Sequence, residues 1–177
     1  MRYIKKAQQT SYEDKFNFTQ EENTRFARAN LTKLVYTAAH CEDIQTTLTQ
    51  TQTIMDGISV GGVAVTDIIT IVNEQYEQAF LQKVLADSTK TTTDKALTML
   101  YHNMRQQIFV DGNKRTALLI ANQLMIAGGA GLINVPLDKW DQWQQLIVDY
   151  YQTNDILKVK QWTYDHGIQG VAVRRVH

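Results

Sequence analysis

The chain contains few of the residues that cross-link a polypeptide or interrupt its helices. Its 177 residues include one cysteine, Cys41, and one proline, Pro136. A single cysteine excludes an intrachain disulfide framework and fits a reducing compartment, and we interpret Cys41 as a small buried residue. With a single proline, little along the chain interrupts a helix. We therefore expect a mostly helical protein that folds without disulfides.

The sequence also lacks an excess of charge and a long apolar run. The 18 Lys and Arg residues balance the 18 Asp and Glu residues, so the formal net charge is zero. Such a chain produces no broad field to attract nucleic acid or an anionic membrane, and we expect neither as a partner. No run approaches the roughly 20 apolar residues of a membrane span, and the start of the chain lacks the apolar core of a secretory signal. These absences predict a cytoplasmic protein.

Length and periodicity predict one helical domain. A chain of this size can bury well over half of its unfolded surface, and we divide it into an N-terminal arm, residues 1–18, and a single domain, residues 19–177. The expected helices are Thr19 to about Glu42, 48–57, Thr66 to beyond Val84, Thr91 to Met104, 113–127, 138–151, and Asn154 or Asp155 to Gly167. The 113–127 helix is apolar on nearly every face, so the other helices should surround it. The fold class is therefore all-α, a bundle around this central helix.

A short hairpin is the exception to the helical pattern. Two β-prone runs flank a Gly-Gly pair, and both glycines can adopt positive φ in a tight turn. The residues concerned are Ile58, Val60, Gly61, Gly62 and Val63. A lone two-stranded hairpin is marginally stable, so it must pack on helices or gain a third strand from a partner. The alternative is an extended connector with no such role.

The polar stretch from Gln107 to Thr116, read Q-I-F-V-D-G-N-K-R-T, lies directly before the central helix. The first backbone N–H groups of a helix lack intrahelical partners and carry the positive end of its dipole, so they bind anions. Gly112 permits close approach of the backbone to a ligand, and Asn113 can cap the helix. Lys114 and Arg115 add two cations. This pattern predicts a phosphate-binding turn, and the alternative is a surface loop that only begins a helix.

This stretch resembles the signature of the Fic/Doc (Fido) family, H-x-F-x-[DE]-G-N-[GK]-R, here Q-I-F-V-D-G-N-K-R. The order of elements is similar over residues 25 to 165, but the specific match is the motif. The resemblance implies a Fic-type helical bundle, ATP and Mg²⁺, with Asp111 as the metal ligand and the hairpin as a flap over the site. The site residues it implies are Gln107, Asp111, Gly112, Asn113, Lys114 and Arg115.

The first motif position departs from the family pattern. The family histidine takes a proton from a hydroxyl group of a target protein, whereas the amide of Gln107 cannot act as a base. We therefore expect the transfer to be strongly impaired. The resemblance implies adenylylation of an exposed Ser, Thr or Tyr, either of a target protein or of the chain itself. Two other positions instead resemble the Doc branch, which phosphorylates its targets. Lys114 replaces the second glycine of the adenylylating members, and Leu118 stands where many of them carry a second arginine. A module that binds nucleotide or protein without catalysis is a further alternative.

Two titratable residues outside the motif, Glu42 and His102, each have two interpretations. Glu42 follows Tyr36 in an order that loosely resembles the inhibitory helix of many family members, and a solvated glutamate at a helix end is the simpler interpretation. The inhibitory glutamate pairs with the second motif arginine, which Leu118 replaces. His102 lies outside the motif and is better interpreted as a structural histidine. The resemblance also implies a possible antitoxin partner.

Overall fold

The computed structural model describes residues 12–40, 78–106 and 113–172. Their elements are α1 (Gln20–Ala29), α2 (Leu31–His40), α5 (Gln78–Ala86), α6 (Thr92–Gln106), α7 (Asn113–Ala127), β1 (Leu132–Ile133), a 3₁₀ turn (Leu137–Lys139), α8 (Trp140–Thr153), α9 (Ile156–Gly167) and β2 (Ile168–Gln169). The predicted all-α class is confirmed. The predicted 48–57 helix, the 58–65 hairpin and the start of the helix expected from Thr66 lie outside these ranges.

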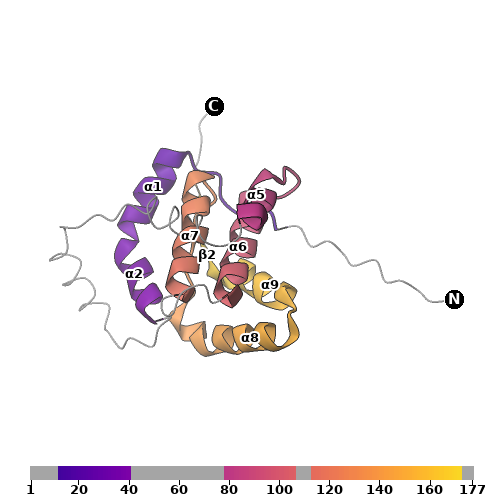
Figure 1. Cartoon of the computed structure of the whole chain (residues 1–177). Coiled ribbons are helices and arrows are strands. Elements are labelled where there is room, and N and C mark those ends of the chain that lie inside the picture. Colours follow the sequence, from indigo (N-terminus) through magenta and orange to yellow (C-terminus); the bar gives the residue numbers. More distant parts are fainter. Residues whose placement is uncertain (1–11, 41–77, 107–112, 173–177) are drawn as a thin grey trace.

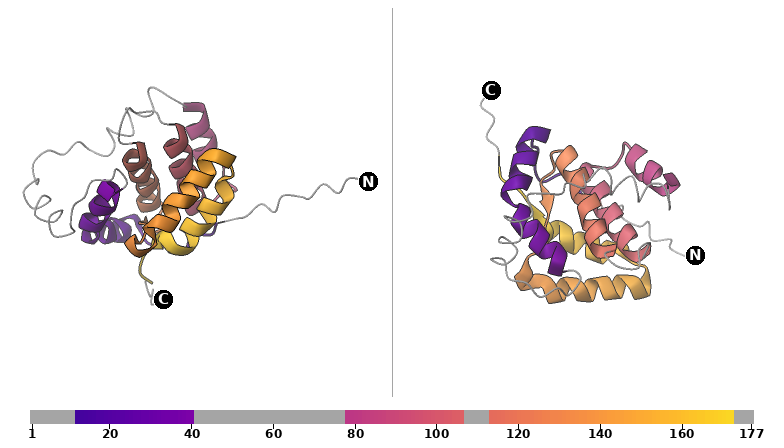
Figure 2. Two further views of the ribbon diagram at one scale, coloured as in Figure 1. Left: turned by 90° about the horizontal axis from the view of Figure 1, so that it is seen from below. Right: turned by 60° about the vertical axis from the view of Figure 1, so that its left-hand side comes forward.

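Helix α7 occupies the centre of the bundle, as its sequence predicts. It lies between the α1–α2 pair on one side and α6 on the other (Figure 1). The views in Figure 2 show α8 and α9 side by side across the bundle. Ala117, Leu118, Ala121 and Met125 of α7 are buried in the main core. The element that carries the predicted anion site is therefore fixed by packing along its length.

The long first helix predicted from Thr19 to about Glu42 is two helices in the structure. Its start is as expected, because the Thr19 side chain accepts from the Glu22 N–H and the Glu22 carboxylate accepts from the Thr19 N–H. The helix then ends at Ala29, and Asn30 has φ −109° and ψ 8°. The Asn30 side-chain amide donates to the Phe26 carbonyl oxygen at 2.9 Å, and such local bonds compete with helix propagation. The prediction of one continuous helix was therefore wrong.

Aromatic residues fill the space between α7 and the two C-terminal helices. Trp140, Trp143 and Trp162 are all buried, as expected for core residues. The indole N–H of Trp143 donates to the hydroxyl of Tyr101 on α6 at 2.9 Å. The start of α8 lies two residues after the predicted one because the 3₁₀ turn precedes it.

The C-terminal end of α7 is held by glycine geometry and by a buried amide. Gly129 has φ +68°, and its carbonyl oxygen accepts from the Phe18 N–H at 2.8 Å. A Cβ atom at Gly129 would lie 1.9 Å from the Phe18 carbonyl oxygen. The Asn23 side chain donates to the carbonyl oxygen of Met125 at 2.8 Å and to that of Gly131 at 3.1 Å. These contacts attach α1 to the turn that ends α7.

The small sheet joins the turn after α7 to the end of α9. Leu132 pairs with Gln169 and Ile133 with Ile168 in an antiparallel register. The other edge of β1 is bonded to a side chain. Asn122 of α7 accepts from the Ile133 N–H at 2.8 Å and donates to the Ile133 carbonyl oxygen at 2.9 Å. One amide therefore satisfies both backbone groups of Ile133.

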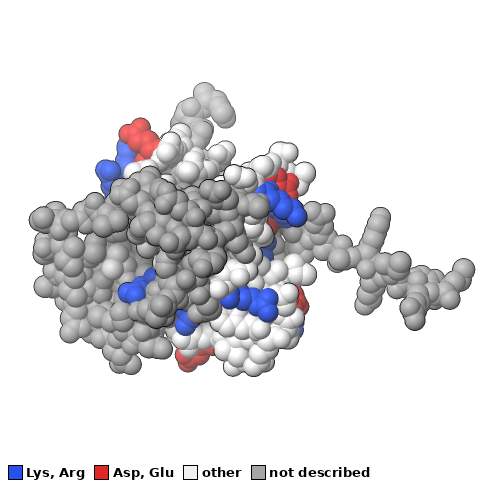
Figure 3. Space-filling model, in the orientation of Figure 1, with Lys and Arg blue, Asp and Glu red and all other residues white. Residues whose placement is uncertain are grey.

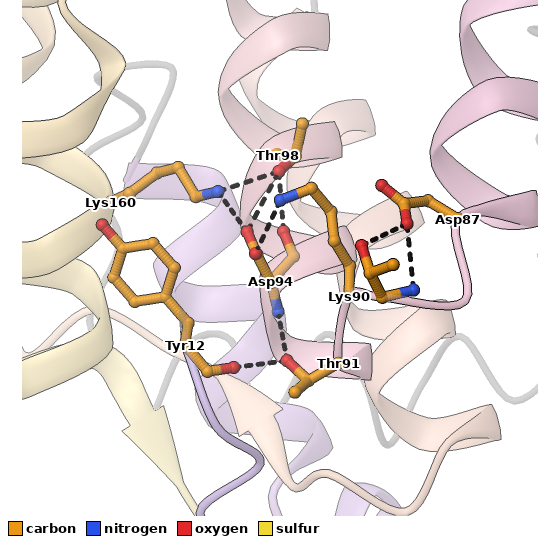
Figure 4. Close-up of polar contacts among 8 residues, drawn as sticks. Tyr12, Asp87, Lys90, Thr91, Asp94, Thr98 and Lys160 are labelled. Carbon is orange, nitrogen blue, oxygen red and sulfur yellow. Dashed lines mark hydrogen bonds and ion pairs between the residues drawn. The ribbon is translucent and has the colours of Figure 1, made fainter. Parts of the chain in front are cut away.

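Residues 12–18 of the predicted arm are attached to α6 and α9. Tyr12 is buried in the main core, and its carbonyl oxygen accepts from the Thr91 hydroxyl (Figure 4). The Asp14 carboxylate accepts from the Thr93 N–H at 2.7 Å and so caps α6. The Nζ atom of Lys160 on α9 lies 4.8 Å from the centroid of the Tyr12 ring. This part of the arm therefore packs against residues that are distant in the sequence.

Candidate functional site

The predicted anion site lies where four helix ends meet. The C-terminal ends of α2 and α6, the N-terminal end of α7 and the start of α8 gather at the lower end of the bundle in Figure 1. Asn113 is the first residue of α7 and only 9% exposed. The predicted residues Gln107, Asp111 and Gly112 lie outside the described ranges, as do Glu42 and the hairpin. The described part of the site therefore consists of the first turn of α7 and its surroundings.

Lys114 borders a cavity between α7 and α8. The cavity has a volume of about 270 Å³. It is lined by Lys114, Trp140, Trp143, Gln144, Ile147, Val148 and Tyr151.

Arg115 borders a second, larger cavity on the opposite side of the same turn. This cavity has a volume of about 570 Å³ and runs between α7 and the α1–α2 pair. Its described lining is mostly apolar, contains Arg28 and Arg115, and includes no acidic residue. Leu118 also lines it and is 2% exposed. Lys114 and Arg115 are consecutive in the sequence but face different cavities, because neighbouring helical residues are about 100° apart around the axis.

Two aromatic side chains near this turn, His40 and Trp140, were not predicted to belong to the site. His40 is the last residue of α2, and its ring meets the Trp140 ring edge-on, with centroids 4.9 Å apart at an interplanar angle of 74°. Trp140 lines the same cavity as Lys114. The contact joins residues 100 positions apart, so local sequence patterns carry no signal for it.

His102 is structural in its contacts, as expected. Its ring stacks on Phe80 of α5, with centroids 3.7 Å apart and an interplanar angle of 16°. Its Nε2 atom lies 3.4 Å from Nε2 of Gln106, one turn along α6. These contacts fix the ring against α5.

On the face shown in Figure 3, the Lys and Arg side chains of the described residues lie in small separate groups, some of them beside Asp and Glu. Within the described ranges, no three His, Cys, Asp or Glu residues are grouped as a metal site. None of the described helices is long and apolar enough to cross a membrane.

Comparison with known proteins gives one match. A family model described as the Fic/DOC family matches residues 2–125. The match covers the motif stretch and nearly all of α7. No curated protein matches the chain, and no solved structure matches it.

Proposed function

The chain belongs to the Fic/DOC family, and from this membership we propose that it transfers AMP from ATP to a hydroxyl side chain of a protein. The observation that carries the proposal is the first turn of α7, where a buried helix start, Lys114 and Arg115 lie between two cavities. Backbone N–H groups at a helix start and two cations are suited to the phosphates of a nucleotide. These features support ATP as the substrate of the proposed reaction.

Each motif residue has a role in this proposal. Gly112 would let the backbone approach the phosphates, and Asn113 would hold the turn at the start of α7. Lys114 would act as a point charge, while the guanidinium of Arg115 would bind phosphate oxygens in a fork. Asp111 would hold Mg²⁺, which neutralises phosphate charge when bound. The flap residues around Gly61 and Gly62 would align the target segment by strand addition.

The target is an exposed Ser, Thr or Tyr hydroxyl on another protein or on a second copy of the chain. Gln107 can donate a hydrogen bond to position that hydroxyl, but its amide has no usable proton affinity. General-base catalysis typically contributes 10²- to 10⁴-fold, so transfer by this chain should be slow. An antitoxin that covers the site, and a role for Glu42 in inhibition, belong to the same proposal.

Phosphotransfer is the second candidate, and one observation favours it. Leu118 is buried in the main core and lines the Arg115 cavity, so this wall is apolar where many adenylylating members carry a second arginine. A site with fewer phosphate contacts can hold the triphosphate in a different register. The γ-phosphate would then be transferred to the hydroxyl in place of AMP.

Labelled ATP separates these functions. The Gln107→His variant, which restores a base, is incubated with ATP labelled at the α- or γ-phosphorus and with a lysate of target proteins. Protein labelled from the α-position supports adenylylation, and protein labelled from the γ-position alone supports phosphotransfer. If neither label is transferred and the variant is folded, the result supports a binding module without catalytic activity.

A binding measurement tests the phosphate site separately. Arg115→Gln should weaken ATP binding at least about tenfold, because it removes a charge-assisted contact. Arg28→Gln is the matched control, since Arg28 lines the same cavity from α1. ATP affinity that is unchanged in Arg115→Gln would contradict the placement of the phosphates.

A further inference from the structure

The larger cavity, between α7 and the α1–α2 pair, extends well beyond the first turn of α7. Its lining residues from α7 recur at the spacing of helical turns and end at Ala127, so they form one face of the helix. At a rise of about 1.5 Å per residue, the stretch from Arg115 to Ala127 covers about 18 Å. Figure 1 shows α1 and α2 following one another along this face. We propose that the cavity binds a long-chain carboxylate, with its carboxylate group at Arg28 and its alkyl chain along α7.

Apolar side chains line the cavity from two sides. Leu118 is 2% exposed, whereas Leu31 and Leu119 are 44% and 37% exposed, so two large apolar side chains beside the cavity face water. A ligand that covers them removes apolar surface from solvent. The volume of about 570 Å³ also falls in the range of small-molecule sites, roughly 300 to 1,000 Å³. The apolar lining residues from α2 and α7 are Leu31, Leu34, Val35, Ala38, Leu118, Leu119, Ile126 and Ala127.

Arg28 supplies a positive charge beside this apolar surface. It is exposed in the last turn of α1. The nearby carboxylate of Glu21 is paired with Arg25, and no ion pair found among the described residues includes Arg28. A guanidinium binds a carboxylate through two parallel hydrogen bonds. A cation next to an apolar groove that has no acidic residue in its described lining indicates a ligand with an anionic head and an apolar body.

The second cation of the cavity lies at a different level. Arg115 is in the first turn of α7, and the proposed function assigns it to the phosphates of ATP. Arg28 belongs to α1, which is attached to the other end of α7 through the bond from Asn23 to Met125. The carboxylate site is therefore separate from the phosphate site, and the inference does not require the transfer reaction.

Equilibrium dialysis of the full chain against labelled dodecanoate, below the concentration at which it forms micelles, tests the proposal. Hexanoate, octanoate and decanoate are compared with it. Burial of each added CH₂ group should lower Kd about threefold to fourfold, because the alkyl chain lies along the apolar face of α7. Dodecanol, which has the same chain without the charge, should bind at least about tenfold more weakly than dodecanoate.

Three variants locate the head group and the chain. Arg28→Gln should raise the Kd for dodecanoate about tenfold or more and leave that for dodecanol unchanged. Leu31→Glu places a carboxylate beside the groove and should also raise the Kd for dodecanoate about tenfold or more. Leu85→Glu is its matched control, because Leu85 on α5 is 46% exposed and is not among the lining residues. Thermal midpoints show that each variant is folded.

ATP binding separates the two arginines. Arg28→Gln should leave the affinity for ATP unchanged, and Arg115→Gln should weaken ATP binding but affect dodecanoate less than Arg28→Gln does. If ATP is neither bound nor used while dodecanoate binding follows the pattern above, the proposed function fails and the carboxylate site stands.

Four results overturn the carboxylate site. The first is a folded chain that shows no saturable binding of dodecanoate. The second is equal affinity for dodecanol and dodecanoate, which removes the role of Arg28. The third is an equal loss in Leu31→Glu and Leu85→Glu, which places the binding elsewhere. The fourth is a dimer in sedimentation experiments that dissociates in Leu31→Glu, because the groove would then be covered by a second copy of the chain.

Discussion

Lys160 on α9 places its Nζ atom 2.5 Å from Oδ1 of Asp94 on α6, and both side chains are buried, 7% and 5% exposed. Lys90 approaches the other carboxylate oxygen at 2.9 Å, and the Thr98 hydroxyl lies 2.9 Å from Nζ of Lys160 (Figure 4). Burial opposes the charge on Asp94, but the hydrogen bonds from Lys160 and Lys90 outweigh burial and lower the pKa of Asp94 below 3.8. Burial lowers the pKa of Lys160, against the attraction of Asp94.

Acid should therefore weaken the protein through Asp94. Because its pKa is lower in the folded than in the unfolded chain, ionised Asp94 stabilises the fold fully above about pH 5, and this contribution is lost as the pH falls through 3.8 and below. The loss should not exceed about 1.4 kcal/mol per pH unit for this one group. Urea unfolding between pH 6 and pH 3 measures it. Asp94→Asn should reduce the pH dependence over this range.

At pH 7 the same substitution should lower the free energy of unfolding by about 3 kcal/mol or more. It leaves Lys160 charged, buried and without a carboxylate, which is the expensive outcome for a buried pair. Replacement of both partners, Asp94→Leu with Lys160→Met, should cost much less than the sum of the single changes. Additive losses in this double-mutant cycle would show that the two residues are not coupled.

Gly129 should not tolerate a side chain. Gly129→Ala forces alanine into φ +68° and places its Cβ 1.9 Å from the Phe18 carbonyl oxygen. Backbone strain alone costs about 1 to 3 kcal/mol, so the free energy of unfolding should fall by at least about 2 kcal/mol. Gly167→Ala is the control, because its Cβ would meet only the side chain of Thr163, with Cγ2 at 3.1 Å. That change should stay within about 1 kcal/mol, and similar losses for both would contradict the geometry.

Asn122 should be one of the most sensitive polar positions of the fold. Asn122→Ala leaves the N–H and the carbonyl oxygen of Ile133 buried without their partner. Each such group costs about 1 to 3 kcal/mol, so a loss of about 2 to 6 kcal/mol is expected in chemical denaturation. Asn103 on α6 is also buried, but its Nδ2 has no hydrogen-bond partner in the described structure. Asn103→Ala should therefore cost clearly less, and the reverse order would show that the Asn122 bonds are not stabilising.

The capping box at the start of α1 can be tested with two threonines. Thr19→Ala removes the acceptor of the Glu22 N–H and should cost about 1 kcal/mol. Thr24 lies inside α1, where its hydroxyl donates back to the Gln20 carbonyl oxygen. Thr24→Ala should cost less than half as much, because alanine is the better residue inside a helix. Thermal unfolding of the two variants gives the comparison, and equal losses would argue against the box.

The elements that sequence predicted well are those whose signals are local. Thr19 and Glu22 mark a helix start within four residues, the Thr91 hydroxyl accepts from the Asp94 N–H, and Asp155 caps α9 as expected. The apolar residues of 113–127 predicted a central helix, and most of them are buried, although Leu119 is 37% exposed. In these cases the residues that set the start or the apolar character of the helix lie within one short stretch of sequence.

The rest depended on contacts between distant residues. The break at Asn30 was missed because the apolar spacing continues across it, although a side-chain bond to Phe26 ends the helix there. The motif predicted where α7 starts, but it did not predict which residues of other helices lie beside that start. Only the fold brings His40 to Trp140, and only helical geometry separates Lys114 and Arg115 into two cavities. The Asp94–Lys160 pair likewise joins residues 66 positions apart.

The side-chain amide of Asn122 also limits where another protein can pair with the backbone of this one. It occupies the hydrogen-bonding positions that a neighbouring polypeptide would need at Ile133, while β2 occupies the opposite side of β1. Neither border of β1 is thus open for backbone pairing at Ile133, and β1 cannot pair there with an extended segment of another protein. A client protein that docks in extended form must therefore be received somewhere other than β1.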